Sequence, residues 1–205
     1  MMVRTNLVKE ELDVEQRLQQ MRLDRKLLLE VRDLARAAAN STTSFHTANA
    51  SGTYAYIEGT WALRDRFVGP DWETDRSEGV EAIFNKALML RVAFSNVDVA
   101  ADQFRHPKPR SPKGAGAERI CQGNLFDDDL PSYAPVEQGG VATYYMMVDE
   151  RGAAELSRPV IQARTFTACI ERIFLSDGLN SSLDNLVQEN DDRADDFDPM
   201  VIARL

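Results

Sequence analysis

Glu58 has the most favourable surroundings for chemistry of any acid in the chain, because it stands among aromatic residues. In a helix, Tyr54 and Trp61 would lie beside it. A carboxyl group packed against apolar rings has a raised pKa and can transfer protons. The competing interpretation is a surface glutamate, with the aromatic side chains forming core. The aromatic residues concerned are Tyr54, Tyr56, Trp61, Phe67 and Trp72.

A basic, proline-rich segment spans residues 104–119 (FRHPKPRSPKGAGAER). Residues before proline avoid the helix, so the composition predicts a linker or a long exposed loop. An extended arm of this kind can follow a phosphate backbone or an acidic protein surface. The alternatives are a solvated linker, or a segment that folds against the acidic C-terminal third of the same chain. Its candidate nucleic-acid-binding residues are Arg105, Lys108, Arg110, Lys113 and Arg119.

Two residues after this segment, QGNLF from Gln122 to Phe126 forms a candidate docking peptide. They resemble the short peptide with which many bacterial replication and repair proteins bind the sliding clamp. The resemblance implies that Gln122 fixes the register and that Leu125 and Phe126 fill an apolar pocket of a protein partner. The usual leucine at the second position is Gly123 here. The competing interpretation is that Leu125 and Phe126 anchor the loop on the core.

Other catalytic and metal-binding patterns are not found. His46 and His106 are far apart and have no Cys or His at ligand spacing. Neither Cys121 nor Cys169 stands in a catalytic context, and no G-x-S-x-G occurs. The glycines at 114–116 do not complete a phosphate-binding loop. The sequence therefore predicts no metal and no cofactor, and the chain is more typical of a binding protein than of an enzyme.

The charge of the chain is strongly segregated. The net charge is -9 overall, made up of -2 in residues 1–99, +3 in residues 100–124 and -10 in residues 125–205. Broad nucleic-acid binding needs a basic surface, so an acidic chain disfavours it and leaves room for one local basic contact.

Length and hydropathy indicate one main folded domain in the cytoplasm. The chain has 205 residues, of which 43% are hydrophobic, and this suits a single sizeable core. No apolar run approaches the roughly 18 residues that span a membrane, and the N-terminus lacks the apolar region of a signal peptide. We therefore expect a cytoplasmic protein with no membrane partner and with two free thiols.

Helical periodicity is clearest in the N-terminal half. It predicts a long helix over residues 13–39, a second over residues 53–68 and a third over residues 77–94. In the second helix, Tyr54, Ile57 and Trp61 would lie on one face. The first carries two apolar stripes, more than one neighbour would cover, so it is also a candidate for homo-oligomer formation.

Strand signals are clearest at residues 141–161. VATYYMMV, a turn sequence and AAELSRPVI predict a β-hairpin in which Pro159 requires an edge strand. Apolar spacing then predicts an amphipathic helix over residues 164–175, and residues 189–198 (ENDDRADDFD) read as a solvated acidic tail.

Together these elements predict an α+β fold. We expect a helical N-terminal region of about three helices at 1–103 and a basic Pro/Gly loop or linker at 104–140. A β-hairpin with a following helix at 141–188 would pack on those helices, and an acidic tail would occupy 189–205.

Three hypotheses for function follow. The first is a non-enzymatic adaptor, inhibitor or regulatory protein that binds another macromolecule through an exposed element. The second is a nucleic-acid-associated accessory factor that uses the basic loop and the peptide at 122–126. The third is an enzyme that uses carboxylates such as Glu58.

Overall fold

A computed structural model describes residues 5–122 and 140–178 of the chain; residues 1–4, 123–139 and 179–205 lie outside the described part. These residues form helices and a seven-stranded mixed sheet, which confirms the predicted α+β class. The elements, in chain order, are β1 (Asn6–Val8), α1 (Glu11–Gln20), α2 (Arg25–Asn40), α3 (Ala50–Phe67), β2 (Glu73–Asp75), η1 (Ser77–Gly79), β3 (Ala82–Asn85), β4 (Leu90–Asn96), α4 (Ala115–Gln122), β5 (Ala142–Val148), β6 (Ala154–Gln162) and β7 (Thr165–Ser176).

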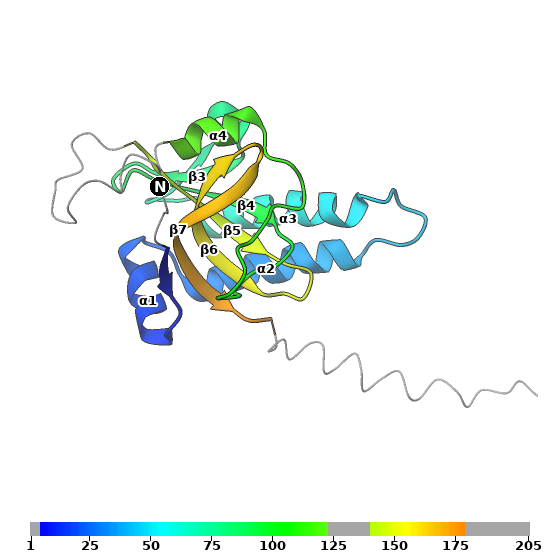
Figure 1. Ribbon diagram of the computed structural model, residues 1–205, viewed down its shortest axis with the longest axis horizontal. Helices are drawn as coiled ribbons and strands as arrows, with labels where there is room; N and C mark the ends of the chain where they lie inside the picture. Colours follow the sequence, from blue (N-terminus) through cyan, green and yellow to red (C-terminus); the bar gives the residue numbers. More distant parts are fainter. Residues whose placement is uncertain (1–4, 123–139, 179–205) are drawn as a thin grey trace, which may run out of the picture.

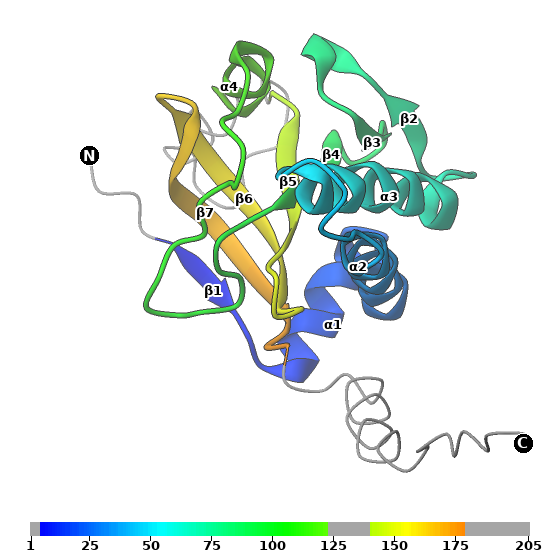
Figure 2. The same cartoon turned by 90° about the vertical axis from the view of Figure 1, so that its right-hand side faces the viewer.

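The strands lie in the order β1-β7-β6-β5-β4-β3-β2 (Figures 1 and 2). Strands β4 and β5 are parallel neighbours, and so are β1 and β7, while every other pair is antiparallel. Parallel neighbours need a crossover connection. Between β4 and β5 this connection includes the basic segment and α4.

The single helix predicted for residues 13–39 is wrong, because the chain breaks between α1 and α2. Arg22 has a φ of 54°, outside the helical range. The carboxylate of Asp24 then caps α2 by accepting a hydrogen bond from the backbone N–H of Leu27 at 3.0 Å. Met21 and Leu23 are buried at the break itself, so the apolar pattern continues through it and conceals it.

The second predicted helix, residues 53–68, is confirmed as α3. Gly59, which weakens the helical propensity, is required by packing. A Cβ added at Gly59 would lie 2.5 Å from the ring of Phe94 on β4, so only glycine lets the helix approach the sheet this closely.

The third predicted helix, residues 77–94, is wrong: this region forms η1, β3 and β4. Its apolar residues line strands that have covering layers on both faces. The usual alternation of polar and apolar residues is therefore lost, and the remaining pattern resembles that of a helix. The turn between the strands places Met89 at a φ of 48°.

The predicted β-hairpin is confirmed as β5 and β6, but the edge position predicted for Pro159 is wrong. Strand β6 lies between β5 and β7, and the register shifts between Arg158 and Pro159. An irregularity of this kind accommodates a residue that lacks an N–H group.

The helix predicted for residues 164–175 is also wrong, since this region forms β7. Strands β6 and β7 are joined by Ala163 and Arg164, which both have positive φ. Such a turn normally carries glycine or asparagine, so this sequence gave no hairpin signal.

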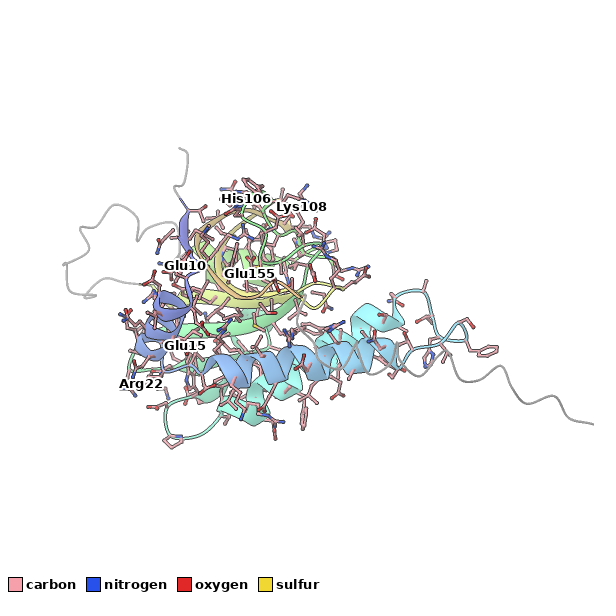
Figure 3. The ribbon with its side chains drawn as sticks, turned by 90° about the horizontal axis from the view of Figure 1, so that it is seen from below. Glu10, Glu15, Arg22, His106, Lys108 and Glu155 are labelled. Carbon is pink, nitrogen blue, oxygen red and sulfur yellow. The ribbon has the colours of Figure 1, made fainter. Side chains whose placement is uncertain are left out.

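Each face of the sheet has its own covering layer (Figures 2 and 3). Helices α2 and α3 lie together on one face, which we call the helix-covered face. Residues 97–114 and α4 lie on the other, the loop-covered face. His106 and Lys108 appear on the side of the sheet opposite to α2, with Glu155 between the two layers.

Candidate protein-binding surface

Helix α3 directs its smallest residues towards the rest of the molecule. Ala55, Gly59, Ala62 and Leu63 are buried on the side that meets α2 and the sheet. The small size of Ala55, Gly59 and Ala62 allows close contact between the layers, and this fixes which side of α3 faces solvent.

Large apolar side chains occupy that opposite, solvent-facing side. Ile57 and Trp61 are each 52% exposed, Val68 is 45% exposed and Tyr54 is 39% exposed. The spacing of Tyr54, Ile57 and Trp61 by three and four residues places them along one line of α3, and Val68 follows at the C-terminal cap of the helix. We call Tyr54, Ile57, Trp61 and Val68 the α3 stripe. Tyr54, Ile57 and Trp61 share a face, as their spacing predicts, but this face is exposed and does not form core.

The α3 stripe continues towards the connection between α2 and α3, which projects beyond the sheet (Figure 1). The ring edge of His46 meets the Tyr54 ring, with centroids 5.7 Å apart and an interplanar angle of 82°. Phe45, the preceding residue, is 99% exposed. The apolar surface therefore extends from the helix to the end of the hairpin.

Acidic side chains flank the α3 stripe. Glu58 is four residues after Tyr54 and three before Trp61, and Asp65 is four after Trp61, so both lie beside the stripe. Glu58 makes no ion pair with any residue that the structure describes, whereas Asp65 pairs with Arg66. Arg64, on the other side of the helix, is neutralised by Glu81.

Glu58 does not have the surroundings that an acid catalyst needs. It is half-buried on α3, and it does not line any of three cavities formed by the described residues. Two of the rings expected to surround it belong to the α3 stripe and face solvent, while Trp72 is buried elsewhere, with its indole N–H donating to the carbonyl of Arg22.

The basic segment lies along the loop-covered face. Val97 forms a β-bridge with Pro109, and Pro107 and Ala117 are buried. Three of the five candidate nucleic-acid-binding residues have acidic partners within the chain. These pairs are Arg105 with Asp98 at 3.9 Å, Arg119 with Glu78 at 2.6 Å, and Arg110 with Glu150.

Lys113 is directed into the protein. Its Nζ donates to the Ser95 hydroxyl at 2.7 Å and lies 4.9 Å and 5.2 Å from the ring centroids of Tyr145 and Phe166. Burial lowers the pKa of Lys113 to about 8. The aromatic faces replace part of the hydration that the ammonium loses. No sequence signal distinguishes this lysine from its exposed neighbours.

Lys108 is exposed, and its ammonium makes no ion pair with another described residue. Its backbone nevertheless holds the loop, because the N–H of Lys108 donates to the Asp98 carboxylate at 2.8 Å. Gln122 is the last residue of α4. The side chain of Gln122 and the whole of Leu125 and Phe126 lie outside the described residues, so their predicted role stays a prediction.

A buried ion pair attaches the connection after β4 to the sheet. Nη2 of Arg172 lies 2.6 Å from Oε2 of Glu155, and the two side chains are 3% and 0% exposed. Ala101 N–H donates to Glu155 at 2.7 Å, while the Arg172 guanidinium donates to the carbonyls of Asp102 and Arg105. Both charges are thus surrounded by further hydrogen bonds, which a buried pair needs in order to be tolerated.

A second polar cluster joins α1 to β5 and β7. The guanidinium of Arg17 contacts Glu171 at 2.9 Å, and the Tyr144 hydroxyl donates to Glu171 at 2.5 Å. Burial alone would raise the pKa of Glu171, but the hydrogen bonds from Arg17 and Tyr144 outweigh burial and lower it. Burial and the Glu171 charge raise the pKa of Tyr144. This cluster fixes the position of α1.

The described residues were also compared with the requirements of a metal site, a thiol nucleophile and a membrane-spanning helix. They contain no group of three or more His, Cys, Asp or Glu residues that could hold a metal ion. Cys121 and Cys169 are free, as expected, and burial raises the pKa of each thiol to about 12, so neither is a ready nucleophile. No helix in residues 5–122 and 140–178 is long and apolar enough to span a membrane.

Comparison with models of protein families, with curated proteins and with solved structures gives no match, so the case for function rests on the chain's own residues.

Proposed function

We propose that this protein is a non-enzymatic binding protein and that the α3 stripe receives an amphipathic helix of another protein. One observation carries the proposal: α3 has apolar side chains on two sides, and the described residues cover only one of them. Exposed apolar side chains gathered in one patch are typical of interaction sites, whereas single ones are ordinary.

The composition of the α3 stripe suits a protein interface. Trp61 and Tyr54 are of the residue types that contribute most to binding free energy, and Ile57 lies between them in the sequence. Burial of one large apolar side chain stabilises a complex by about 1.5–3 kcal/mol before the entropic costs of association. Three such side chains in line can therefore support a specific contact.

The flanking charges indicate which partner fits. Glu58 and Asp65 lie along the same border of the stripe, so a partner helix with basic residues along that border is favoured. An anionic membrane or a nucleic acid would instead be repelled by these carboxylates. The free thiols suit a reducing compartment such as the cytoplasm. A nucleic-acid-associated role has less support, because three of the five basic-segment residues are already paired with acids.

The proposal can be tested by affinity capture from the native host. The wild type would be compared with the double variant Ile57→Glu/Trp61→Glu and with Ala37→Glu, a matched control on the exposed side of α2. We expect a partner that is lost with the double variant and retained with the control. Its binding region should be a helix with an apolar stripe and one basic border, and a synthetic peptide of that region should bind.

Two results would contradict this assignment. Equal capture by the wild type and by the double variant would mean that the α3 stripe is not the binding surface. If light scattering shows a wild-type dimer that Ile57→Glu/Trp61→Glu converts to a monomer, the occupant is a second copy of this chain and not a different protein.

A further inference from the structure

A cavity of about 230 Å³ lies beside the turn between β3 and β4, and we call it the turn cavity. Its walls come from the break between α1 and α2, from the connection between α3 and β2, and from the end of β3 with the turn that follows. Arg22, which Figure 3 labels at that break, is one of the lining residues. Pockets for drug-sized ligands measure about 300–1,000 Å³, so an occupant of this one must be small.

Asn85, the last residue of β3, forms part of the wall of the turn cavity. Its side chain is fully buried, and Oδ1 accepts a hydrogen bond from the backbone N–H of Leu88 at 3.0 Å. This bond identifies which end of the side-chain amide is the oxygen. Asn85 therefore closes the turn between β3 and β4 with its oxygen, and its nitrogen remains as a donor.

The side-chain nitrogen of Asn85 has no acceptor. Nδ2 is buried and makes no hydrogen bond with any residue that the structure describes. A buried N–H group without a partner lowers stability, and the large majority of buried polar groups in native proteins are paired. Bulk water does not reach Nδ2, so its acceptor has to come from a group that enters the turn cavity.

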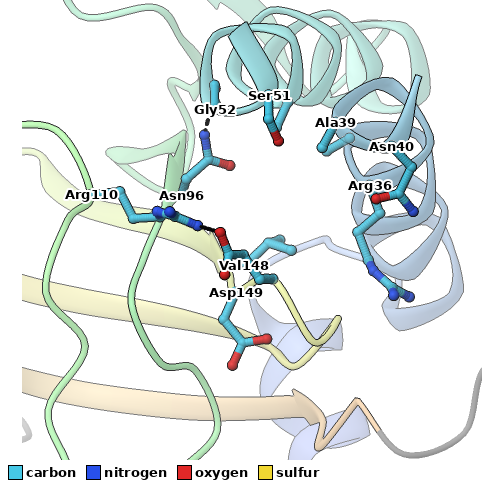
Figure 4. A pocket seen from close by; sticks show the side chains of 12 residues that line it. Arg36, Ala39, Asn40, Ser51, Gly52, Asn96, Arg110, Val148 and Asp149 are labelled. Carbon is cyan, nitrogen blue, oxygen red and sulfur yellow. Dashed lines mark hydrogen bonds and ion pairs between the residues drawn. The ribbon is translucent and has the colours of Figure 1, made fainter. Parts of the chain in front are cut away.

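The cavity between the hairpin of α2 and α3 and the turn of β5 and β6 differs in this respect (Figure 4). There the side-chain N–H of Asn96 donates to the carbonyl of Gly52 at 2.8 Å, and Arg110 pairs with Glu150. These polar groups are satisfied within the chain. The turn cavity is the stronger candidate for a ligand because its buried donor is not.

Apolar surface lies on the same side of the sheet as the Asn85 side chain. Side chains two residues apart in a strand point to the same face, so Asn85 shares its face with Ile83. Ile83 and Trp72 belong to one buried apolar cluster, and Trp72 also lines the turn cavity. The indole N–H of Trp72 is occupied by the carbonyl of Arg22 at 3.1 Å, so the ring offers the cavity apolar surface and no second donor. Pro70 adds to this surface.

The charged side chains that line the turn cavity are paired with one another. Arg22 pairs with Asp71, and Lys86 pairs with Glu73 at 3.0 Å. Two positive and two negative charges cancel, so these side chains favour neither an anion nor a cation. A charged ligand would lose its hydration beside Trp72 without gaining an opposite charge, and a neutral ligand would not.

We propose that the turn cavity binds a small neutral amide. The carbonyl oxygen of the amide would accept the hydrogen bond that Nδ2 of Asn85 can donate, and its alkyl groups would lie against Trp72 and Pro70. An amide combines a strong acceptor with zero net charge, as the buried donor and the balanced charges require. This inference is independent of the α3 stripe.

The test is a nuclear magnetic resonance titration of the ¹⁵N-labelled full chain with N-methylacetamide. The side-chain amide protons of Asn85 are observed directly, and a new hydrogen bond should move them downfield. We expect this shift to be saturable in the millimolar range and to be accompanied by a shift of the Trp72 indole N–H. N-methylthioacetamide has the same shape and a weaker acceptor, so it should bind about twofold to tenfold more weakly. Acetate carries an acceptor and a charge, and it should also bind more weakly.

Variants of the wall show whether the ligand occupies the turn cavity. Ala87→Leu adds bulk to the wall at an exposed position of the turn, so it should fold and should abolish the shifts. Ala37→Leu, on the exposed side of α2, is the matched control and should bind like the wild type. Asn85→Ala removes the donor and, when folded, should weaken binding by about twofold to tenfold, measured at the Trp72 indole N–H.

Several results would overturn the proposal. One is the absence of a saturable shift of the Asn85 side-chain protons with N-methylacetamide. Another is a shift that persists unchanged in folded Ala87→Leu. Equal binding of N-methylthioacetamide would show that the carbonyl does not accept from Asn85. Acetate that binds as tightly as N-methylacetamide would overturn the assignment of a neutral ligand. A cross-peak between water and the Asn85 side-chain protons that persists at saturating N-methylacetamide would identify a trapped water molecule as the occupant.

Discussion

The helix-covered face of the sheet is packed at its centre with apolar side chains such as Val92, Met146 and Leu156. The loop-covered face buries the Glu155–Arg172 pair, Lys113 and Asp149 beside a smaller apolar cluster. A helix satisfies its own backbone and needs only an apolar surface beneath it. An irregular segment such as residues 97–114 carries backbone groups that need partners, and buried polar side chains provide them.

The largest effect should come from breaking the ion pair on the loop-covered face. Glu155→Leu leaves the buried Arg172 charge without its carboxylate and should lower the free energy of unfolding by about 3–5 kcal/mol. Urea denaturation measures this loss. The double variant Glu155→Leu/Arg172→Met removes both charges and should recover much of the stability. If the double variant is as unstable as the single one, the lost hydrogen bond from Ala101 matters more than the charge.

The second-largest effect should be a dependence of the unfolding free energy on pH that comes from the buried Lys113. The folded-state pKa of Lys113 is lowered from 10.5 to about 8, so the unfolded chain binds more protons between these two values. The contribution of Lys113 to the free energy of unfolding should therefore increase by about 3 kcal/mol as the pH rises from about 8 to 10.5. Below about pH 8 the folded state buries the charged ammonium, and this lowers the free energy of unfolding.

Lys113→Met should lack this increase with pH. The measurement is the difference in unfolding free energy between the wild type and Lys113→Met at several pH values from 7 to 10.5. A constant difference across that range would show that Lys113 does not titrate with a lowered pKa.

On the helix-covered face, Gly59→Ala should cost about 1–3 kcal/mol because the new methyl group collides with the ring of Phe94. Gly52→Ala is the matched control on the same helix, since a Cβ there meets nothing within 4 Å. The control should be neutral or should stabilise the protein by up to about 1 kcal/mol. Thermal melts of both variants measure the two changes in stability. If Gly59→Ala and Gly52→Ala change stability equally, the close packing of α3 on the sheet does not require Gly59.

The smallest effect should come from the α3 stripe. Trp61→Ser should change the unfolding free energy by no more than about 0.5 kcal/mol, because this side chain is half exposed. Leu63→Ala, on the buried side of the same helix, should cost about 2–5 kcal/mol. A large loss with Trp61→Ser, measured by the same urea denaturation, would mean that Trp61 serves folding and is not kept for a partner.

The sequence alone determined the α+β class, the position of α3 and the hairpin of β5 and β6. Their signals are local: helical spacing in one case, and strand formers around a turn sequence in the other. It also identified the common face of Tyr54, Ile57 and Trp61, because helical spacing depends only on the helix itself.

Tertiary structure decided the rest. Strands β3, β4 and β7 are covered on both faces, and this removes the alternation by which a strand is recognised. Whether a helix face is core or surface depends on which layer lies against it, so the exposure of Trp61 follows only from the placement of α3. Residue type also does not reveal the burial of Lys113 or of Glu155. A lysine suits an exposed loop and a glutamate suits an exposed strand position, but the path of residues 97–114 over the sheet encloses both side chains.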